Sequence, residues 1–438
     1  MLWLLFGYPK HVNKLRTFLL CLLLFQPFAL AYEELWDTPQ GRERIFNALV
    51  ELFKDNYWDE AYRDWDDWGQ TYKDRALNAD TRLEFDSALR RMVNALNDDH
   101  SRWVGLVSEL SLEGGAELSP ALGIRHNYLE GIGLVIERAY PETPAYEAGL
   151  RRGDVIVQVG DTVLSDLSSG YAVTSALAES VRLGEISLVV RHKLTSRRVT
   201  IIPAPISFAE VQDLPQADML DESTGYLYIP SFQAEGLADK VHTLIADLQS
   251  QGARSLILDL RDNPGGRLGE LGLVLGAFIE GPWVEAISRG DVVWRSSFNR
   301  EKGTNILESA EGRTLARDQL DTPAIFDGPL AVIVTEQNSS AGEVAALVLK
   351  EMGRATIVGE KTLGNVEAIQ IFDLPDESLV YVAVANLQGV TGEAYTTGVK
   401  PDIEITASLE DLARGFDAPV AEALKSLKAL PFTPGKFF

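Results

Sequence analysis

The sequence predicts a multidomain α+β protein with a helical N-terminal region, a small β-rich domain and an α/β core built from β-α-β crossovers. Three observations predict this class. The 438 residues exceed the size of one compact domain. Apolar residues recur at helical spacing before residue 104, and short strand-like runs with Gly- and Pro-rich turns follow. From Tyr226 onward, apolar strand-like runs alternate with amphipathic helical patterns, which is typical of a parallel sheet.

Residues 1–31 have the three parts of a secretory signal peptide. Three basic residues between positions 10 and 16 precede a short apolar run, and Ala29-Leu-Ala31 supplies the small residues of a cleavage site. We therefore expect a periplasmic or secreted protein, cleaved after Ala31, with no membrane-spanning segment in the mature protein. The alternative is an uncleaved membrane anchor, because the residues before the apolar run are numerous.

Charge and cysteine content exclude several function classes. The formal net charge is −24, and removing the three basic residues of positions 1–31 makes it −27. Such an acidic protein is not expected to bind nucleic acid or an anionic membrane surface. The one cysteine, Cys21, lies within the predicted signal peptide. The mature protein is therefore expected to have no disulfide and no thiol chemistry.

Residues 32–104 are predicted to form the helical N-terminal region. Apolar residues recur at steps of three and four from Phe85 to Leu96, which places them on one face of a helix. The helix is expected to end before Asp98-Asp-His-Ser101, so that His100 lies in a polar loop. A loop histidine is usually solvated or close to a helix end. It is also the type of side chain that acts as a general base near neutral pH.

The stretch from Leu330 to Gly364 is predicted to form a strand, a turn and a helix. An apolar run ends at Val334, polar turn residues follow, and an amphipathic pattern begins after Ser340. A serine at such a turn can be a nucleophile, because it is exposed beside the free N–H groups that begin a helix. The alternative is that Ser339 or Ser340 only caps the helix.

Residues 105–206 resemble a PDZ domain, with its β-sandwich-like fold. The likeness is carried by four short sequences in order: Gly131-Ile-Gly-Leu134, Pro144-Ala145, Ala148-Gly-Leu150 and Gly153-Asp-Val-Ile156. PDZ domains bind the C-termini of polypeptides by strand addition. The resemblance implies that the carboxylate-binding loop consists of Gly131, Ile132, Gly133 and Leu134. The alternative is a PDZ fold that is kept only as a regulatory lid.

The segment from Tyr226 to Asp402 resembles the catalytic core of the C-terminal processing (tail-specific) serine peptidases and the related tricorn core. The matching sequences are Asp259-Leu-Arg-Asp-Asn-Pro-Gly-Gly266, Ser340-Ala-Gly-Glu343, the run 354–364 and Gly398-Val-Lys-Pro-Asp402. The resemblance implies an α/β protease core over 207–408 and a C-terminal helical tail over 409–438. It also implies that Ser340 is the nucleophile, and that backbone N–H groups of Gly265 or Gly266 and of Ala341 form the oxyanion hole.

The base of this core is expected to be a histidine. Peptidases of the Ser-Lys type carry a lysine at the position of Asn365, so that mechanism is not expected here. The branch that resembles the tricorn core uses Ser, His and Glu, and Asp98-Asp-His-Ser101 fits its histidine element. The resemblance therefore makes His100 the base and points to Glu393 as the acid that orients it. Glu367 and Glu343 are the other candidates for the acid.

These observations lead to two hypotheses. The first is an exported serine endopeptidase that hydrolyses peptide bonds of a protein or peptide substrate, with a PDZ domain that binds or gates substrate C-termini. The second is a catalytically inactive relative that binds a peptide or a hydrophobic ligand. The sequence has no metal-ligand spacing and no phosphate-binding glycine loop, so no metal and no cofactor are expected.

Overall fold

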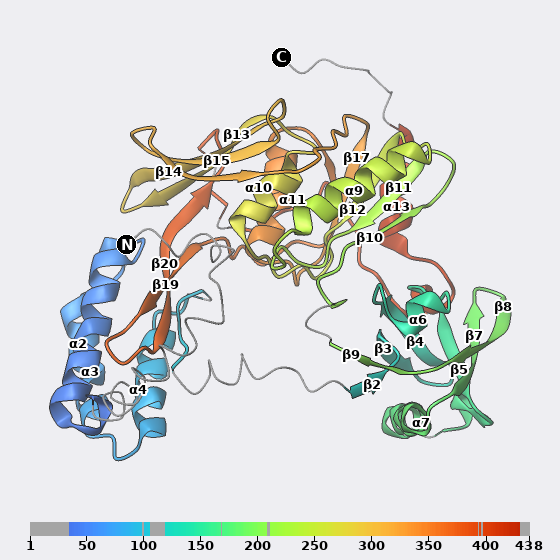
Figure 1. Cartoon of the computed structure of the whole chain (residues 1–438), viewed down its shortest axis with the longest axis horizontal. Helices are drawn as coiled ribbons and strands as arrows, with labels where there is room; N and C mark the ends of the chain where they lie inside the picture. Colours follow the sequence, from blue (N-terminus) through green and yellow to red (C-terminus); the bar gives the residue numbers. More distant parts are fainter. Residues whose placement is uncertain are drawn as a thin grey trace, which may run out of the picture.

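The computed structural model describes residues 35–105, 119–207 and 211–429, except positions 99, 168, 393 and 396. The predicted signal peptide therefore lies outside the described residues. Within them, no helix is both long enough and apolar enough to cross a bilayer. Helices and sheets are mixed throughout the protein (Figure 1), which confirms the multidomain α+β class.

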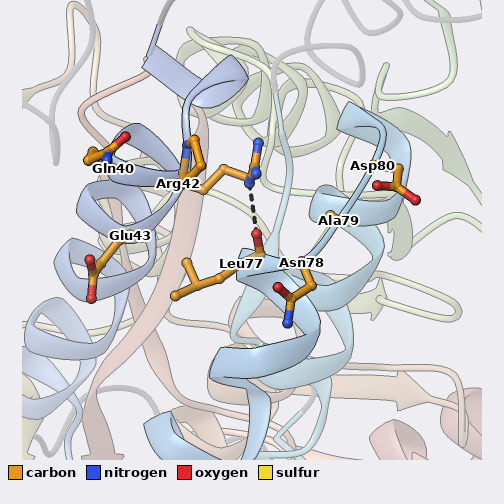
Figure 2. A pocket seen from close by; sticks show the side chains of 8 residues that line it. Gln40, Arg42, Glu43, Leu77, Asn78, Ala79 and Asp80 are labelled. Atoms are coloured by element: carbon orange, nitrogen blue, oxygen red, sulfur yellow. Dashed lines mark hydrogen bonds between the residues drawn. The ribbon is translucent and has the colours of Figure 1, made fainter.

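Helices pack together in the N-terminal region, as the apolar spacing predicts. They are α2 (Pro39–Asn56), α3 (Trp65–Leu77) and α4 (Arg82–Asn94). Thr38 and Thr81 cap α2 and α4, because each side chain accepts a backbone N–H of the first turn. The apolar face of α4 is fully buried against α2 and α3. Figure 2 shows Arg42 of α2, whose Nε donates to the Leu77 carbonyl at 3.0 Å where α3 ends.

The central sheet has the strand order β10-β11-β12-β17-β18-β21. All neighbours from β11 to β21 are parallel, and β10 is antiparallel to β11. This agrees with the predicted β-α-β crossovers. The strands are β10 (Gln216–Met219), β11 (Thr224–Tyr228), β12 (Ser255–Asp259), β17 (Leu330–Val334), β18 (Thr356–Gly359) and β21 (Ile403–Glu404).

Helices cover both faces of the central sheet. In β17, Leu330, Val332 and Val334 pack in the core that includes α9 (Leu237–Ser250), α10 (Leu268–Leu275) and α11 (Ala341–Glu351). The alternate residues Ala331 and Ile333 pack against α13 (Ala418–Ala429), which follows α12 (Leu409–Ala413). The uninterrupted apolar sequence of β17 results from this burial on both sides.

A second sheet of seven strands lies beside the central sheet and is antiparallel. Its strands are β1 (Arg102–Trp103), β13 (Gly281–Ser288), β14 (Asp291–Asn299), β15 (Thr304–Ser309), β16 (Thr314–Gln319), β19 (Ala368–Asp373) and β20 (Leu379–Gln388). The parallel sheet expected from Tyr226 onward does not include β19 and β20, which pair in this antiparallel sheet. Their connection is too short for a crossover helix, so the two strands form a hairpin. This hairpin packs against the N-terminal helices.

The PDZ-like segment forms a separate sheet of order β3-β4-β5-β7-β8, with β6 paired to β5. Its elements are β3 (Ile124–Leu129), β4 (Gly133–Ala139), α6 (Pro144–Glu147), β5 (Val155–Val159), β6 (Thr162–Val163), α7 (Gly170–Leu183), β7 (Ile186–His192) and β8 (Thr195–Ile201). Two short strands, β2 (Ser119–Ala121) and β9 (Ala204–Ile206), pair beside it. Figure 1 shows this segment below the central sheet and apart from the N-terminal helices.

Arg82 ties the N-terminal helices to the β19–β20 hairpin. Its Nη1 lies 2.8 Å from the Asp376 carboxylate, which is fully buried, and its Nη2 donates to the Ser378 hydroxyl at 2.6 Å. The Arg82 Nε also pairs with Asp86 at 3.0 Å. The Arg82 guanidinium therefore neutralises two carboxylates, that of Asp376 in the hairpin turn and that of Asp86 on its own helix.

We predict that Arg82→Met lowers the free energy of unfolding by about 3 kcal/mol, because it leaves Asp376 buried without its partner. Urea unfolding followed by tryptophan fluorescence measures this change. The matched control is Arg90→Met on the same helix, where an exposed side chain is replaced; a change within about 0.5 kcal/mol is expected. Equal stabilities of the two variants would contradict the role given to Arg82.

Candidate active site

Ser340 lies at the turn between β17 and α11. Its backbone has φ 50° and ψ −130°, a conformation that non-glycine residues rarely adopt. The Ser340 amide donates to the Asn365 carbonyl at 2.6 Å, and its carbonyl accepts from the amides of Glu343 and Val344. A strained serine at the end of a parallel strand, held by bonds of its main chain, has the geometry of a nucleophile turn.

The capping alternative does not describe Ser340 or Ser339. Ser340 occupies the position before the first helical residue, but its side chain makes no capping hydrogen bond. The Ser339 hydroxyl donates to the Pro264 carbonyl at 3.1 Å, away from the helix. The Ser340 hydroxyl is therefore not used to hold the structure of the turn.

The loop that follows β12 packs directly against this turn. Asn263 holds this loop in place. Its side-chain amide donates to the Ile229 carbonyl at 2.9 Å, and its main-chain carbonyl accepts from the Ser339 amide at 3.2 Å. Gly265 has a φ of 96°, and a Cβ there would lie 2.7 Å from the Ser340 Cβ. Only glycine can bring the loop this close to the serine.

Among the described residues, two backbone N–H groups beside Ser340 have no acceptor. Gly265 is not one of them, because its amide donates to the Asn263 Oδ1 at 2.8 Å. In the described parts of the protein, the amides of Gly266 and Ala341 donate to no acceptor. Of the predicted oxyanion donors, Gly266 and Ala341 are available in this structure, and the Gly265 amide is occupied.

His100 pairs with Glu367. The His100 Nδ1 lies 3.0 Å from the Glu367 Oε2, and the two side chains are only 12% and 16% exposed. Both atoms are buried, and neither has a different partner among the described residues. Burial raises the pKa of Glu367, but the hydrogen bond and charge of His100 and two backbone contacts lower it more, so the pKa lies below its usual value. An ionised Glu367 can hold a proton on Nδ1 of His100.

The loop of His100 is anchored on both sides. The Asp98 carboxylate accepts from the amides of His100, at 3.0 Å, and Ser101, and it also accepts from the Tyr57 hydroxyl at 3.1 Å. The Ser101 hydroxyl accepts from the Ala383 amide of β20 at 3.1 Å. The histidine is therefore fixed to the helical region and to the antiparallel sheet.

The segment from Thr362 to Glu367 joins the nucleophile to the histidine. Asn365 accepts the Ser340 amide, and Glu367, two residues later, holds His100. The structure thus brings Ser340 and His100, which lie far apart in the sequence, to one short segment. The Asn365 side chain makes no hydrogen bond to another described residue.

Glu343 is the clamp of this segment. Its carboxylate is fully buried on the first turn of α11 and accepts from the Thr362 hydroxyl, the Gly364 amide at 2.6 Å and the Asn365 amide at 2.8 Å. Burial raises the pKa of Glu343 in spite of these bonds. With its oxygens used in this way, Glu343 positions the segment and is not paired with His100.

The remaining acid candidates have different outcomes. Glu393, the first choice from the sequence, lies outside the described residues. Glu367, an alternative from the sequence, is the acid that the structure pairs with His100. The hydrogen bonds of the Glu343 carboxylate and the contact of the Asn365 carbonyl could not be predicted from the sequence, because neither depends on a local pattern. No cluster of metal-binding side chains occurs in the part of the protein that is described.

The structure does not support the predicted carboxylate-binding loop of the PDZ-like segment. Gly131 and Ile132 form the turn of the β3–β4 hairpin, and Gly133 begins β4. Leu134 pairs with Tyr128 on one side and with Ile156 on the other, so both edges of β4 are occupied there. Strand addition needs a free edge. Among the described strands of this sheet, β3 has such an edge on the side of α7.

Comparison with known proteins matches two parts of the sequence to families. Residues 223–405 match the model of peptidase family S41, and residues 135–183 match that of a PDZ domain. The protein is 29% identical over 342 residues to a C-terminal processing peptidase of Tetradesmus obliquus, covering 74% of this protein and 69% of the relative. It is 28% identical over 384 residues to a carboxyl-terminal-processing protease of Synechocystis, covering 86% and 82%.

The fold is also found in solved structures. The protein resembles an S41 protease of Bacteroides fragilis with a TM-score of 0.57 and 19% identity, covering 86% of this protein and 96% of the other. At this identity the likeness concerns the arrangement of the elements. In sequence, the protein is also 26% identical to a chloroplast carboxyl-terminal-processing peptidase of Arabidopsis thaliana, and it spans 63% of the length of that relative.

We predict that Glu343→Gln loosens the segment from Thr362 to Glu367. The amide side chain keeps the volume but loses the charge that accepts three donors, so the amides of Gly364 and Asn365 should exchange with deuterium about tenfold faster. Hydrogen–deuterium exchange read by mass spectrometry measures this rate. The matched control is Glu351→Gln at the other end of α11, whose carboxylate accepts from Thr391 and Tyr395. Unchanged protection of the segment in Glu343→Gln would contradict the clamp.

Proposed function

We propose that this protein, a serine-type peptidase of family S41 with a PDZ domain, is an exported endopeptidase that uses Ser340, His100 and Glu367. One observation carries the proposal: the segment from Thr362 to Glu367 holds the main chain of Ser340 at Asn365 and the imidazole of His100 at Glu367. The unused Ser340 hydroxyl and the two free amides beside it fit the same chemistry.

In the proposed mechanism, neutral His100 takes the proton of the Ser340 hydroxyl as its oxygen attacks the peptide carbonyl. Glu367 keeps Nδ1 of His100 protonated and stabilises the imidazolium. The amides of Gly266 and Ala341 donate to the oxyanion of the tetrahedral intermediate. His100 then gives its proton to the leaving amine. The C–N bond breaks, the amine departs, and the acyl group remains as an ester on Ser340. Water, deprotonated by His100, releases the acid and restores the serine.

The contacts of Asn365 with the proposed site are made by its main chain. The carbonyl of Asn365 holds the Ser340 amide, and its own amide is held by Glu343. The side-chain amide of an asparagine does not accept a proton near neutral pH. In the proposed mechanism, the base therefore comes from outside the core, from His100 in the loop after the N-terminal helices.

The PDZ domain is proposed to bind substrate C-termini and to gate the site. Arg125 of the edge strand β3 reaches the core, where its Nη2 lies 2.8 Å from the Asp262 carboxylate. Asp262 also accepts from the Thr335 hydroxyl at 3.1 Å and has a φ of 61°. Thus β3 is linked to the two loops that carry Gly266 and Ser340. A peptide strand added to β3 would act on the residue that makes this link.

The substrate is proposed to be the C-terminal part of an exported protein. The printed names of relatives describe C-terminal processing, and a PDZ domain recognises the ends of polypeptides. The expected signal peptide would place the enzyme in the periplasm or outside the cell. The alternative from the sequence, an inactive binding protein, is decided by the following test.

We predict that Ser340→Ala and His100→Ala each lower kcat for hydrolysis of casein by about 10⁶-fold, because the nucleophile and its base act as a unit. Glu367→Gln should lower kcat by about 10⁴-fold through loss of the correct tautomer. Glu336→Gln, an exposed carboxylate in the turn before Ser340, is the matched control and should retain activity. A fluorophosphonate probe should label the wild type at Ser340.

Three outcomes bear on the alternatives. An inert wild type that the probe does not label would favour the inactive binding protein. Full activity of Glu367→Gln with loss of activity in Glu393→Gln would move the acid to Glu393. Loss of activity in Asn365→Ala, with the fold intact, would mean that its side chain takes part in catalysis.

We further predict that Arg125→Met lowers kcat by about twofold to fivefold for a short peptide with an amidated C-terminus, with KM nearly unchanged, because the partly exposed ion pair with Asp262 is lost. Such a peptide cannot use the PDZ domain, so the effect reports on the loops alone. Arg198→Met, an exposed arginine on β8, is the control. A higher kcat in Arg125→Met would mean that the contact restrains the enzyme.

A further inference from the structure

A cavity of about 550 Å³ lies between the PDZ domain and the central sheet. Its walls come from the end of β4 and the loop before β5 on one side, and from β10, β11 and the segment around α12 on the other. Polar and apolar side chains share the lining, including Met219, Leu220 and Leu412. Asp262 and Thr335 line it, but Ser340, His100 and Glu367 do not, so its contents are a separate question from the hydrolysis at Ser340.

Arg138 is the unusual side chain of this cavity. It is 7% exposed, and its guanidinium lies between two aromatic rings, 4.6 Å from the ring centre of Tyr140 and 4.8 Å from that of Tyr228. Its Nη2 donates to the Leu214 carbonyl at 3.1 Å. Its Nε is buried and has no hydrogen-bond partner among the described residues. An arginine stays protonated under all ordinary conditions, so a buried positive charge remains here.

Most of the other charged groups that line the cavity are paired within the described residues, whereas Arg151, Asp218 and Glu360 make no ion pair there. Arg125 pairs with Asp262 and Glu137, as shown by separations of 2.8 and 3.4 Å. Arg152 pairs with Asp417 at 2.8 Å. Two further groups are matched as well: Arg261 pairs with Asp259 and Asp417, and the Tyr226 hydroxyl donates to Asp259 at 2.6 Å.

Arg138 likewise has no carboxylate within ion-pair distance among the described residues, and unlike Arg151 and Asp218 it is buried. A buried cation is costly unless an anion compensates it. The rings of Tyr140 and Tyr228 compensate in part, through the negative faces of their π systems. They also hold the guanidinium plane in place, and its Nε–H is left without an acceptor among the described residues.

We propose that this cavity binds a single carboxylate on an apolar body, and that Arg138 is its anchor. Arginine matches the planar geometry of a carboxylate. The unpaired carboxylates of Asp218 and Glu360 in the lining would repel a doubly charged anion such as phosphate more strongly than a singly charged one, so one negative charge is favoured. The apolar side chains of Met219, Leu220 and Leu412 suit a hydrocarbon body. The carboxylate can belong to a small organic acid or to the C-terminus of a polypeptide.

The experiment measures binding to the full-length protein by isothermal titration calorimetry, in the Ser340→Ala variant so that no peptide is cleaved. The probes are benzoate and hexanoate as small acids, acetyl-Ala-Ala-Val-Ala with a free C-terminus, and the uncharged benzamide and peptide amide as controls. We expect saturable binding of one carboxylate per protein molecule and no binding of benzamide.

Two variants locate the site. Arg138→Gln removes the charge, and Leu220→Trp fills the cavity from its rim without changing Arg138; each should weaken binding of the bound carboxylate about tenfold or more. Arg198→Gln, an exposed arginine on β8 outside the cavity, should leave Kd unchanged. Circular dichroism melting curves check that each variant is folded.

The outcomes separate the two sources of the carboxylate. If binding of the small acids is weakened by Arg138→Gln while binding of the peptide is not, the ligand is a small acid. If the free-ended peptide binds and loses affinity in both Arg138→Gln and Leu220→Trp, the ligand is the C-terminus of a polypeptide. If no carboxylate binds saturably, or if binding is unchanged in Arg138→Gln, the proposal is overturned.

Discussion

The hydrogen bond from the Ser340 amide to the Asn365 carbonyl is the contact on which the site depends. It couples the strained turn after β17 to the segment before β19, and these belong to two different sheets. Glu343 reinforces the coupling, because its buried carboxylate accepts the Asn365 amide from the same helix that Ser340 precedes. The position of the serine is therefore set by the packing of one sheet against the other, and not by the turn alone.

Much of this arrangement could be predicted from the sequence, for reasons that differ between residues. The strand β17 is buried on both faces, so its apolar run was unambiguous. Ser340 and His100 could be singled out because each stands in a short motif. Glu367 was only one of three candidate acids, because its pairing with His100 depends on where the β19–β20 hairpin lies. That position is determined by contacts with the N-terminal helices, such as those of Arg82.

The errors made from the sequence have a common physical cause. Gly131-Ile-Gly-Leu134 has the composition of a carboxylate-binding loop, but the same glycines serve equally well in a hairpin turn with positive φ. Pairing partners decide between the two, and they come from distant segments. In the same way, β19 and β20 have ordinary strand sequences, and only the short connection between them excludes a place in the parallel sheet.

The proposed catalytic groups are spread along the sequence in an order that has a consequence for biosynthesis. His100 is made early, whereas Ser340 and Glu367 follow only after the PDZ domain and most of the central sheet have been translated. A nascent polypeptide therefore has the proposed base but neither the nucleophile nor the acid until the last quarter of the sequence is being translated. Any fragment that separates the N-terminal helices from the core would likewise lack one of the two. In the proposed mechanism, hydrolysis therefore requires the N-terminal helices and the core together in one folded molecule.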